Sequence, residues 1–439
     1  MHIGLDDTDS TKGGCTTYVA ARIVDDLAKT KIQFIDYPNI IRLNPNIPYK
    51  TRGNAAVALR VRIRTEAFES VQESVIRELE ENSQFGEPNA DPAVVFLKGP
   101  PKGKIREISR KSLSDVVSTD EALRAVRQCK ATAVTYGSGL GLVGATAAVG
   151  QTLDGDYTFE FIAYRNRENW GTPRLVNESS VKRMDESTAP QTFNNYDYEN
   201  HRVLITPHGP DPVLLGIRGE SARIVSKAFR MLKIQEPVER WVIFRTNHGT
   251  DAHLENGLAD DRVKFNAPAV LRGTVASRPV RIAGGHVFFA LGYRRRKIQC
   301  AAFEPTGRFR GVIASLIPGD QVTVYGGVKV HNDFPVTVNL EKVFINRLMD
   351  ESSFKNPICP LCGKHMKSAG RGQGFRCQRC SLYARSAMKS KVEKARTLTT
   401  GFHVPDKKAH RHLTKPLSRY GHEKSGWNHA PPAGVWHQP

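Results

Sequence analysis

The chain lacks the features of a membrane-bound or exported protein. Its 439 residues contain no apolar run of the roughly 18–20 residues needed to cross a bilayer. The first residues read as a strand that runs into acidic residues, and they lack the basic, apolar and small-residue order of a signal peptide. We therefore expect a soluble, cytoplasmic protein with no membrane partner.

Cysteine is also scarce, with seven residues in the whole chain. Four of them form two Cys-x-x-Cys pairs and three are scattered, which is typical of a reducing compartment with a metal site. Fourteen residues separate the pairs, so two tight turns can present four thiolates tetrahedrally and leave no open coordination position. The sequence thus predicts a structural zinc ion in a zinc ribbon, bound by Cys359, Cys362, Cys377 and Cys380.

Negative charge is in deficit. The chain has 64 Lys and Arg against 44 Asp and Glu, which gives a formal net charge of +20. Such an excess favours a polyanionic partner, because fixed cations displace the counterions condensed on phosphates. The alternative is a charge that serves solubility or belongs to a basic tail. We expect nucleic acid as the partner.

The phosphate-binding loop GxxxxGK[ST] is absent, yet the N-terminus carries another candidate nucleotide site. Three aspartates directly follow the first predicted strand, where carboxylates would bind Mg²⁺ together with phosphate oxygens. A polar, Gly-rich segment then precedes a predicted helix, and a helix start is an anion pocket. The alternative is an acidic turn followed by a capping threonine. The residues concerned are Asp6, Asp7, Asp9, Gly13, Gly14 and Thr16.

Two further clusters are candidates for completing that pocket. Lys50 and Arg52, in a Pro-rich loop before a strand, would clamp transferring phosphoryl oxygens, although a plain exposed loop explains them equally well. Gly139 and Gly141, before a second predicted helix, would form another phosphate cradle. Small residues required for helix packing are the alternative there.

The order of predicted elements divides the chain into five parts. Residues 1–154 read as an α/β unit, and residues 155–266 as a strand–helix–strand unit with a long insertion, which suits a ferredoxin-like α+β domain. Residues 267–350 show only short strands, residues 351–385 hold the cysteine pairs, and residues 386–439 form a basic tail whose last dozen residues we expect to be disordered.

The third part predicts a nucleic-acid-binding barrel. Five alternating strands with a helical stretch between the third and fourth follow the order of an OB-fold barrel, with a small Greek-key or SH3-like barrel as the alternative. Aromatic rings and cations alternate at Phe288, Tyr293 and Arg294, which offers base stacking beside phosphate contacts. The alternative is that the rings belong to the core and the cations to a solvated hairpin.

Several segments closely resemble one known family, the archaeal tRNA(Ile) 2-agmatinylcytidine synthetases. The resemblance runs from residue 1 through the zinc ribbon and into the tail, and it is carried by GLDDTDSTKGGCTTYVA, IIRLNPNIPYKTRGNAAV, GLGLVGATAAVG, LLGIRGES, RTNHGTDAHL and PDKKAHRHLTKPLSRYG. It implies a kinase-like domain, a ferredoxin-like domain, an OB-fold and a zinc ribbon. This order agrees with the divisions above.

The resemblance also implies a reaction. Such enzymes use ATP, cleaved to AMP and phosphates, to phosphorylate the C2 oxygen of the wobble cytidine in the CAU-anticodon tRNA(Ile), and the amine of agmatine displaces that phosphate. It implies that Asp6, Asp7 and Asp9 hold ATP–Mg²⁺ and that Thr16 is autophosphorylated.

Agmatine is a dication, so carboxylates should recognise it. Glu220 and Asp251 are candidates, with Arg218 facing phosphate or RNA, whereas a helix-capping Glu and a loop Asp are the structural alternative. Two other functions compete with the ligase: a non-catalytic single-strand-binding protein, which has no use for the N-terminal aspartates, and a small-molecule kinase or amide ligase, which leaves the barrel and ribbon unexplained.

Overall fold

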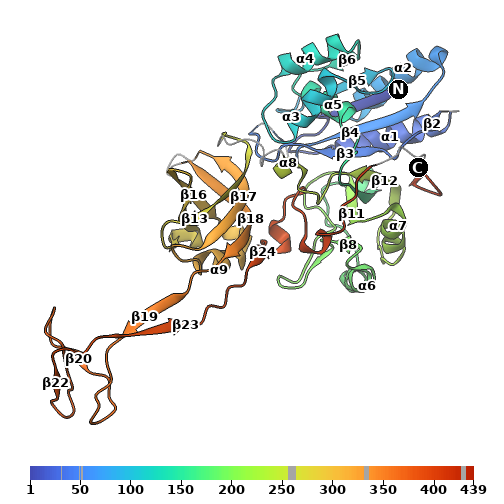
Figure 1. The fold of residues 1–439 in the computed structure, drawn as a ribbon. Helices are drawn as coiled ribbons and strands as arrows, with labels where there is room; N and C mark the ends of the chain where they lie inside the picture. The colour runs from blue at the N-terminus through green and yellow to red at the C-terminus, as the bar shows by residue number, and fades with distance from the viewer. Residues whose placement is uncertain (31, 49, 51–52, 256–263, 331–335, 427–431) are drawn as a thin grey trace.

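The computed structural model describes residues 1–439 except 31, 49, 51–52, 256–263, 331–335 and 427–431. Among the described residues, no helix combines the length and the hydrophobicity that a bilayer crossing requires. An eleven-stranded sheet forms the body of the molecule, and a separate barrel and a ribbon extend from it (Figure 1). The protein is therefore a mixed α/β molecule of several units, as the sequence predicts.

The first part of the large sheet has helices on both faces. Helix α5 packs against β1, β4 and β5 with α3 and α4 beside it, while α1 and α2 cover the opposite face. The strands are apolar along most of their length because both faces are buried. The elements are β1 (His2–Asp6), α1 (Thr16–Ala28), β2 (Gln33–Phe34), β3 (Asn39–Arg42), β4 (Ala55–Arg62), α2 (Phe68–Asn82), β5 (Ala93–Leu97), α3 (Lys104–Ser112), α4 (Thr119–Gln128), β6 (Thr132–Thr135) and α5 (Gly141–Gly150).

The second part of the sheet is antiparallel. Strand β7 lies between β11 and β12, and α7 packs against this group. The long insertion after β7 contains the two-residue strand β10, which pairs with β9 outside the large sheet. The elements are β7 (Thr158–Arg165), α6 (Glu178–Thr188), β8 (Thr192–Phe193), β9 (Tyr196–Asp197), β10 (Arg202–Val203), β11 (Val213–Gly219), α7 (Ala222–Arg230), β12 (Val238–Thr246) and α8 (Ala252–Glu255).

The two parts share one continuous sheet. Strands β3 and β12 run parallel, with Asn39 beside Arg245 and Ile40 beside Thr246. Arg245 is fully buried at this junction, where its guanidinium bonds Asp36 and the carbonyls of Thr152 and Leu153. The shared sheet holds the ends of β1, β3, β7 and β11 in a fixed relation.

The third unit is a closed five-stranded barrel. Its order is β13–β17–β18–β16–β15 and back to β13, and only the β16–β18 pair is parallel. Along the chain, helix α9 lies between β16 and β17, the third and fourth barrel strands, where the sequence predicts it. The elements are β13 (Pro268–Val275), β14 (Val280–Arg281), β15 (Val287–Tyr293), β16 (Arg296–Ala302), α9 (Phe309–Ala314), β17 (Gln321–Lys329) and β18 (Thr337–Arg347).

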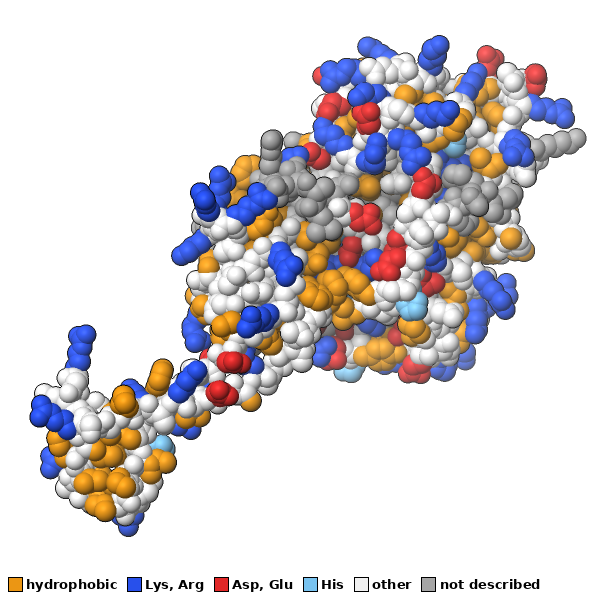
Figure 2. All heavy atoms as spheres, in the orientation of Figure 1, with side chains coloured by type: hydrophobic (Ala, Val, Ile, Leu, Met, Phe, Trp, Pro, Cys, Tyr) orange, Lys and Arg blue, Asp and Glu red, His pale blue; other side chains and the backbone are white. Residues whose placement is uncertain are grey.

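A two-stranded stalk carries the ribbon away from the barrel. Strands β19 (Glu351–Lys355) and β23 (Ser390–Lys394) pair antiparallel, and beyond them lie β20 (Lys367–Ser368), β21 (Phe375–Arg376) and β22 (Tyr383–Ala384) (Figure 1). Figure 2 shows Lys and Arg side chains together with exposed hydrophobic side chains on this distal unit.

The C-terminal segment runs back from the barrel over the large sheet. It adds β24 (Gly401–His403) to β18, crosses the β7–β12 part and ends as β25 (His437–Gln438), which pairs with β12 (Figure 1). The expectation of a disordered end is wrong for residues 432–439. There Trp436 packs its ring against Phe34 and Tyr37, and its carbonyl accepts a hydrogen bond from Ile243 N.

Candidate functional site

A cavity of about 420 Å³ opens where the two parts of the large sheet meet. The end of β1, the start of α1, the start of α5 and the strands β3, β7 and β11 all contribute lining residues. Its volume falls within the range of small-molecule sites. One side of the cavity is acidic and the other is basic, and each is described in turn.

The acidic wall is built at the end of β1. Burial raises the pKa of Asp6 well above its usual range, and the neighbouring Asp7 adds to the shift. Burial also raises the pKa of Asp7 to about 7, against the hydrogen bond that Asp91 N donates to Asp7 Oδ2 at 3.2 Å. Asp9 lines the same cavity. Carboxylates that destabilise one another in this way gain most from a cation between them.

These carboxylates fit a magnesium ion that is shared with a ligand. Among the described residues, only the four cysteines of the ribbon gather at least three His, Cys, Asp or Glu ligand atoms within 4.8 Å of one another. Asp6, Asp7 and Asp9 are therefore arranged more openly. Mg²⁺ is commonly held in this way, by one or two carboxylates plus waters and phosphate oxygens, rather than by an all-protein cage.

Glycines in α5 make room for the aspartates. A Cβ atom at Gly144 would lie 1.7 Å from Asp6 Oδ2, and one at Gly141 would lie 2.4 Å from Asp91 O and 3.1 Å from Asp7 Cβ. The helix thus packs directly against the acidic wall. Gly141 has this packing role, Gly139 turns the chain before the helix with φ 76°, and the cavity-lining residues of this region are Leu140, Val143 and Gly144.

The start of α1 faces the cavity with polar groups. Cys15, Thr16 and Thr17 line it, and no acidic residue lies in the first turn of the helix. Thr16 is buried, and its hydroxyl accepts a hydrogen bond from Thr8 Oγ1 at 3.1 Å. Gly13 and Gly14 form the loop just before the helix, where Ser10 N donates to Gly13 O at 2.9 Å. A helix start of this kind attracts anions.

The basic wall surrounds one buried carboxylate, Glu160 of β7. Arg218 Nε donates to Glu160 Oε1 at 2.9 Å, and Arg42 Nη2 lies 3.7 Å from Glu160 Oε2. Burial alone would raise the pKa of Glu160, but Arg218 and His248 hold it well below its usual range. Arg218 thus lines the cavity, and its role toward phosphate or RNA stays a prediction.

Two neutral histidines belong to this region: His412 lines the cavity, and His248 packs against it. Burial lowers the pKa of His248 to about 4, although Glu160 opposes the shift. Arg42 and then burial hold the pKa of His412 well below its usual range. The two rings meet edge to face at 5.0 Å. His412 comes from the C-terminal segment, about 370 residues from Arg42, so nothing in the local pattern indicated that it lies there.

The loop with the predicted phosphate clamp reaches the cavity only in part. Lys50 lines it, and its ammonium group, which is partly buried, donates to Pro45 O. Burial of the ammonium group, together with Arg411 and Lys329, lowers the pKa of Lys50. Arg52 lies outside the described residues. Two residues of the site were not predicted from the sequence: Arg42, the last residue of β3, and Glu160, which lies in the otherwise apolar β7.

Glu220 and Asp251 are placed away from the cavity lining. Glu220 accepts hydrogen bonds from Arg419 Nε at 2.6 Å and from Lys424 Nζ at 2.5 Å. Asp251 accepts from Lys415 N at 2.8 Å and forms an ion pair with Lys342. Both carboxylates therefore hold the C-terminal segment against the sheet. Their use for a dicationic substrate stays a prediction that the geometry does not favour.

The three predicted RNA-binding residues lie on the barrel, apart from the cavity. Phe288 is buried and its ring lies 6.0 Å from that of Phe303. Tyr293 is half-buried, and the Arg294 guanidinium lies over its ring at 5.5 Å, at the turn between β15 and β16. Tyr293 and Arg294 are thus available to a ligand at this turn, whereas Phe288 is buried outside the barrel core, into which its neighbours Val287 and Phe289 point.

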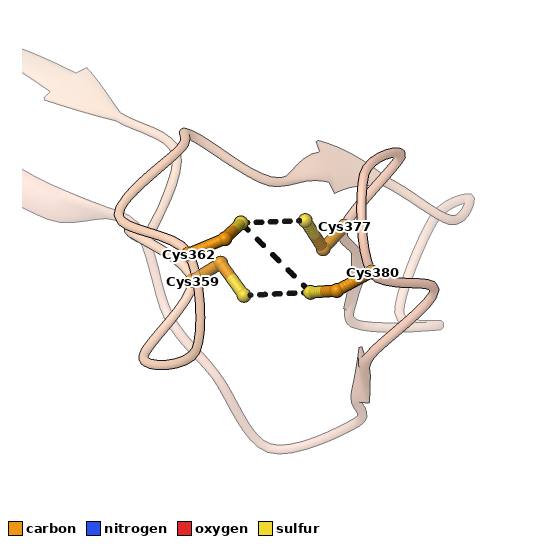
Figure 3. Close-up of side chains that lie close together, drawn as sticks. All are labelled: Cys359, Cys362, Cys377 and Cys380. Atoms are coloured by element: carbon orange, nitrogen blue, oxygen red, sulfur yellow. Dashed lines mark hydrogen bonds between the residues drawn. The ribbon is translucent and has the colours of Figure 1, made fainter.

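The four cysteines converge at one point of the ribbon (Figure 3). The Sγ atoms of Cys359 and Cys380 are 3.3 Å apart, those of Cys362 and Cys377 are 3.4 Å apart, and those of Cys362 and Cys380 are 3.8 Å apart. Tetrahedral Zn–S bonds of about 2.3 Å put the sulfurs roughly 3.8 Å apart, so the four thiolates fit zinc. Backbone N–H groups of Cys380 and Arg379 lower the pKa of Cys377 to about 6, which favours the metal-binding thiolate.

Taken together, the fold and the sites define a multidomain α/β protein that has a cavity with opposed acidic and basic walls, a closed barrel and a zinc-ribbon unit. Family models match three segments: the TiaS TCKD domain at residues 2–138, the TiaS FLD domain at 139–253 and the TiaS C-terminal zinc ribbon domain at 356–398. The chain belongs to the TiaS family, the 2-agmatinylcytidine synthetases of an isoleucine tRNA, as the resemblance in its sequence implies.

Curated relatives match over nearly their whole length. The 2-agmatinylcytidine synthetase TiaS of Archaeoglobus fulgidus is 43% identical, covering 95% of this chain and 97% of its own, and that of Methanosarcina mazei is 42% identical with the same coverage. The crystal structure of TiaS in complex with its isoleucine tRNA and ATP is 41% identical with a TM-score of 0.86, covering 95% and 97%. That of TiaS with the same tRNA, AMPCPP and agmatine is 39% identical with a TM-score of 0.83, covering 95% and 96%.

Proposed function

We propose that the chain is an ATP-dependent ligase that joins agmatine to C2 of the wobble cytidine of the CAU-anticodon tRNA(Ile). The observation that carries this proposal is the cavity, in which carboxylates for a nucleotide's metal face arginines for phosphate, within a chain that matches the family along its length. Relatives with this fold were crystallised with an isoleucine tRNA, ATP and agmatine. A non-catalytic RNA-binding protein has no need of such a cavity.

The chemistry follows from the two walls. Asp6, Asp7 and Asp9 hold ATP through Mg²⁺, which, when bound, neutralises phosphate charge. Phosphorylation turns the C2 oxygen of the base into a good leaving group. The amine of agmatine then forms the N–C2 bond, the C2–O bond breaks, and its electron pair leaves with the phosphate while the amine proton is lost. Thr16, at the start of α1, is the residue that becomes phosphorylated.

The units divide this work. Residues 1–154 form a kinase-like ATP-binding domain and residues 155–266 a ferredoxin-like domain, which agrees with the antiparallel β7–β11–β12 group. Residues 267–350 are an OB-fold that grips RNA, with Tyr293 and Arg294 at its surface. Residues 351–385 are a zinc ribbon, and residues 386–439 are a basic tail. We assign the protein to the cytoplasm, where its tRNA is found.

The test is a reconstituted reaction. Enzyme, ATP, Mg²⁺, agmatine and transcribed tRNA are incubated, and the nucleosides are weighed by mass spectrometry. We expect agmatine incorporation, and a roughly hundredfold or greater loss in Asp7→Asn with tRNA affinity within a few fold. The matched control is Asp120→Asn, an exposed aspartate in the first turn of α4. No nucleoside of increased mass with the wild-type enzyme would refute the proposal.

The phosphorylation site has its own test. Thr16→Ala should block phosphorylation of the enzyme by labelled ATP, whereas Thr119→Ala, at the start of α4 and outside the cavity lining, should not. A phosphopeptide that maps away from Thr16 would contradict this assignment.

A further inference from the structure

The basic wall of the cavity holds more positive charge than its carboxylate balances. Arg42 and Arg218 share the single carboxylate of Glu160, and His248 and His412 are neutral. Burial and the neighbouring Arg218 both lower the pKa of Arg42, so its guanidinium is held in an unfavourable environment. Buried cations of this kind are stabilised by an anion.

One donor on this wall is also left without a partner. Within the part of the chain that the structure describes, Arg42 Nε is buried and makes no hydrogen bond. The nearby Arg218 Nε, in contrast, is bonded to Glu160 Oε1. A buried donor without a partner costs about 1–3 kcal/mol, which a bound anion would recover. Such an orphan beside a cavity is a sign of a ligand position.

A glycine keeps the space open. A Cβ atom at Gly53 would lie 2.9 Å from His412 Nε2 and 3.0 Å from Arg42 Nη1. The two nitrogens therefore approach a common point beside the backbone of Gly53. The backbone of Gly53 is not left-handed, so space is what requires glycine here. All three residues line the cavity.

We propose that Arg42, Arg218 and His412 form a second phosphate pocket, distinct from the aspartate wall, which holds the phosphate group carried by the C2 oxygen of the cytidine. This inference rests on the proposed function, which creates that phosphate monoester. Two guanidinium groups and an imidazole N–H suit a dianionic phosphate, and Arg offers it bidentate hydrogen bonds. The carboxylates on the opposite wall repel the same group. The acidic wall therefore serves the metal ion of ATP, and the basic wall serves the phosphate on the cytidine.

The C-terminal segment therefore supplies part of the active site. Its backbone is fixed beside the pocket, because Gly249 N donates to His412 O and Asp251 N donates to Leu413 O, both at 2.8 Å. Arg419, which is fully buried, anchors it further along through Asp156 and Glu220. Glu220 and Asp251 thus act as positioning residues for His412.

The first experiment titrates inorganic phosphate into the full chain that already holds Mg²⁺ and a non-hydrolysable ATP analogue, by calorimetry. We expect phosphate to bind the wild type, and to bind His412→Gln and Gly53→Ala roughly ten- to a hundredfold more weakly. Gly53→Ala fills the space between Arg42 and His412 but keeps the hydrogen bonds that hold the C-terminal segment, so it remains informative if His412→Gln loosens that segment. The controls are His422→Gln, an exposed histidine of the same segment, and Gly155→Ala, where a Cβ meets nothing within 4 Å.

Two results would overturn the pocket. If phosphate fails to bind once the ATP analogue is present, the nucleotide itself occupies the basic wall and no second phosphate pocket exists. If both variants bind phosphate as the wild type does, the three residues form no phosphate site. The proposed function is tested separately, by label transfer from γ-labelled ATP to tRNA without agmatine. If the wild type transfers no label, the phosphorylated cytidine does not form and the proposed function fails. The phosphate titration would still show whether the pocket exists.

Discussion

Arg419 offers the sharpest test of whether the C-terminal segment is a working part of the enzyme. Its guanidinium makes two 2.9 Å hydrogen bonds to the carboxylate of Asp156 and one of 2.6 Å to Glu220 Oε1. It also donates to Gly249 O at 2.6 Å. The side chain is fully buried. Substituting Arg419→Met keeps much of the volume and removes every one of these bonds.

The free-energy cost of Arg419→Met depends on which other hydrogen-bond and ion-pair partners Asp156 and Glu220 keep. Removing one partner of a buried ion pair costs about 3–5 kcal/mol, because the other charge stays buried. Asp156 still accepts from Lys424 N at 3.1 Å and has Lys415 at 3.6 Å, and Glu220 keeps Lys424 Nζ at 2.5 Å. We therefore take the lower end, about 3 kcal/mol, which opens the segment roughly a hundredfold more often.

Hydrogen exchange measured by mass spectrometry reads this opening directly. Peptides covering residues 404–424 should exchange roughly a hundredfold faster in Arg419→Met, while peptides from β1 and β4 should not change. Arg295→Met, an exposed arginine of the barrel hairpin, is the matched control. Agmatine incorporation should fall with the same variant, because His412 leaves the cavity. Unchanged exchange in residues 404–424 would refute the anchoring role of Arg419.

Three further predictions concern other parts of the molecule. Zinc chelation, or Cys377→Ser, should make residues 356–398 sensitive to proteases without lowering the melting temperature of the barrel, because the ribbon core is small; a protease-resistant metal-free ribbon would contradict this. Burial lowers the pKa of His410 to about 4, so the unfolded chain binds its proton first and stability falls as pH drops from 6.5 to 4. His410→Gln should reduce the fall in the free energy of unfolding between pH 7 and pH 5, measured by urea unfolding, by on the order of 2 kcal/mol; an unchanged difference would argue against it. Gly144→Ala should abolish agmatine incorporation by displacing Asp6, whereas Gly311→Ala, where a Cβ meets nothing within 4 Å, should keep it; full activity of Gly144→Ala would refute the close packing of α5.

Local patterns in the sequence predicted the parts of the fold that local chemistry determines. The spacing of Cys359 and its three partners requires a metal knuckle, and the structure brings their sulfurs together. Alternating residues and a helical stretch likewise predicted the five barrel strands with α9 among them. Asp6 and Asp7 were recognisable as candidates because they stand at the end of a buried strand. In each case the residues that act together are near one another in the chain.

Contacts between distant segments left no such signal. The β3–β12 pairing joins residues about 200 positions apart, and either strand edge fits the local pattern equally well. The final residues look disordered by their Pro and Gly content, yet Trp436 docks on an aromatic surface provided by Phe34 and Tyr37. His412 reads as one of several histidines in a basic tail. Its position beside Arg42 depends on packing between distant segments, which the periodicity of the local sequence does not indicate.

The same packing connects the barrel to the cavity. The loop after β3 is held by three units at once: Asn44 Nδ2 donates to Asn266 O at 2.7 Å, Arg411 Nη1 donates to Asn46 Oδ1 at 2.8 Å, and Lys329 of β17 donates to Asn46 O. Gly327 makes this approach possible, because a Cβ there would lie 2.0 Å from Asn46 Oδ1.

Ile47 and Lys50 of that loop line the cavity. A movement of the barrel relative to the sheet would therefore shift the cavity wall itself. Under the proposed function, RNA bound by the barrel and the cavity wall that holds its phosphate would be connected through this single loop. The link is physical, through named hydrogen bonds, and Gly327→Ala would strain it without altering any residue of the cavity.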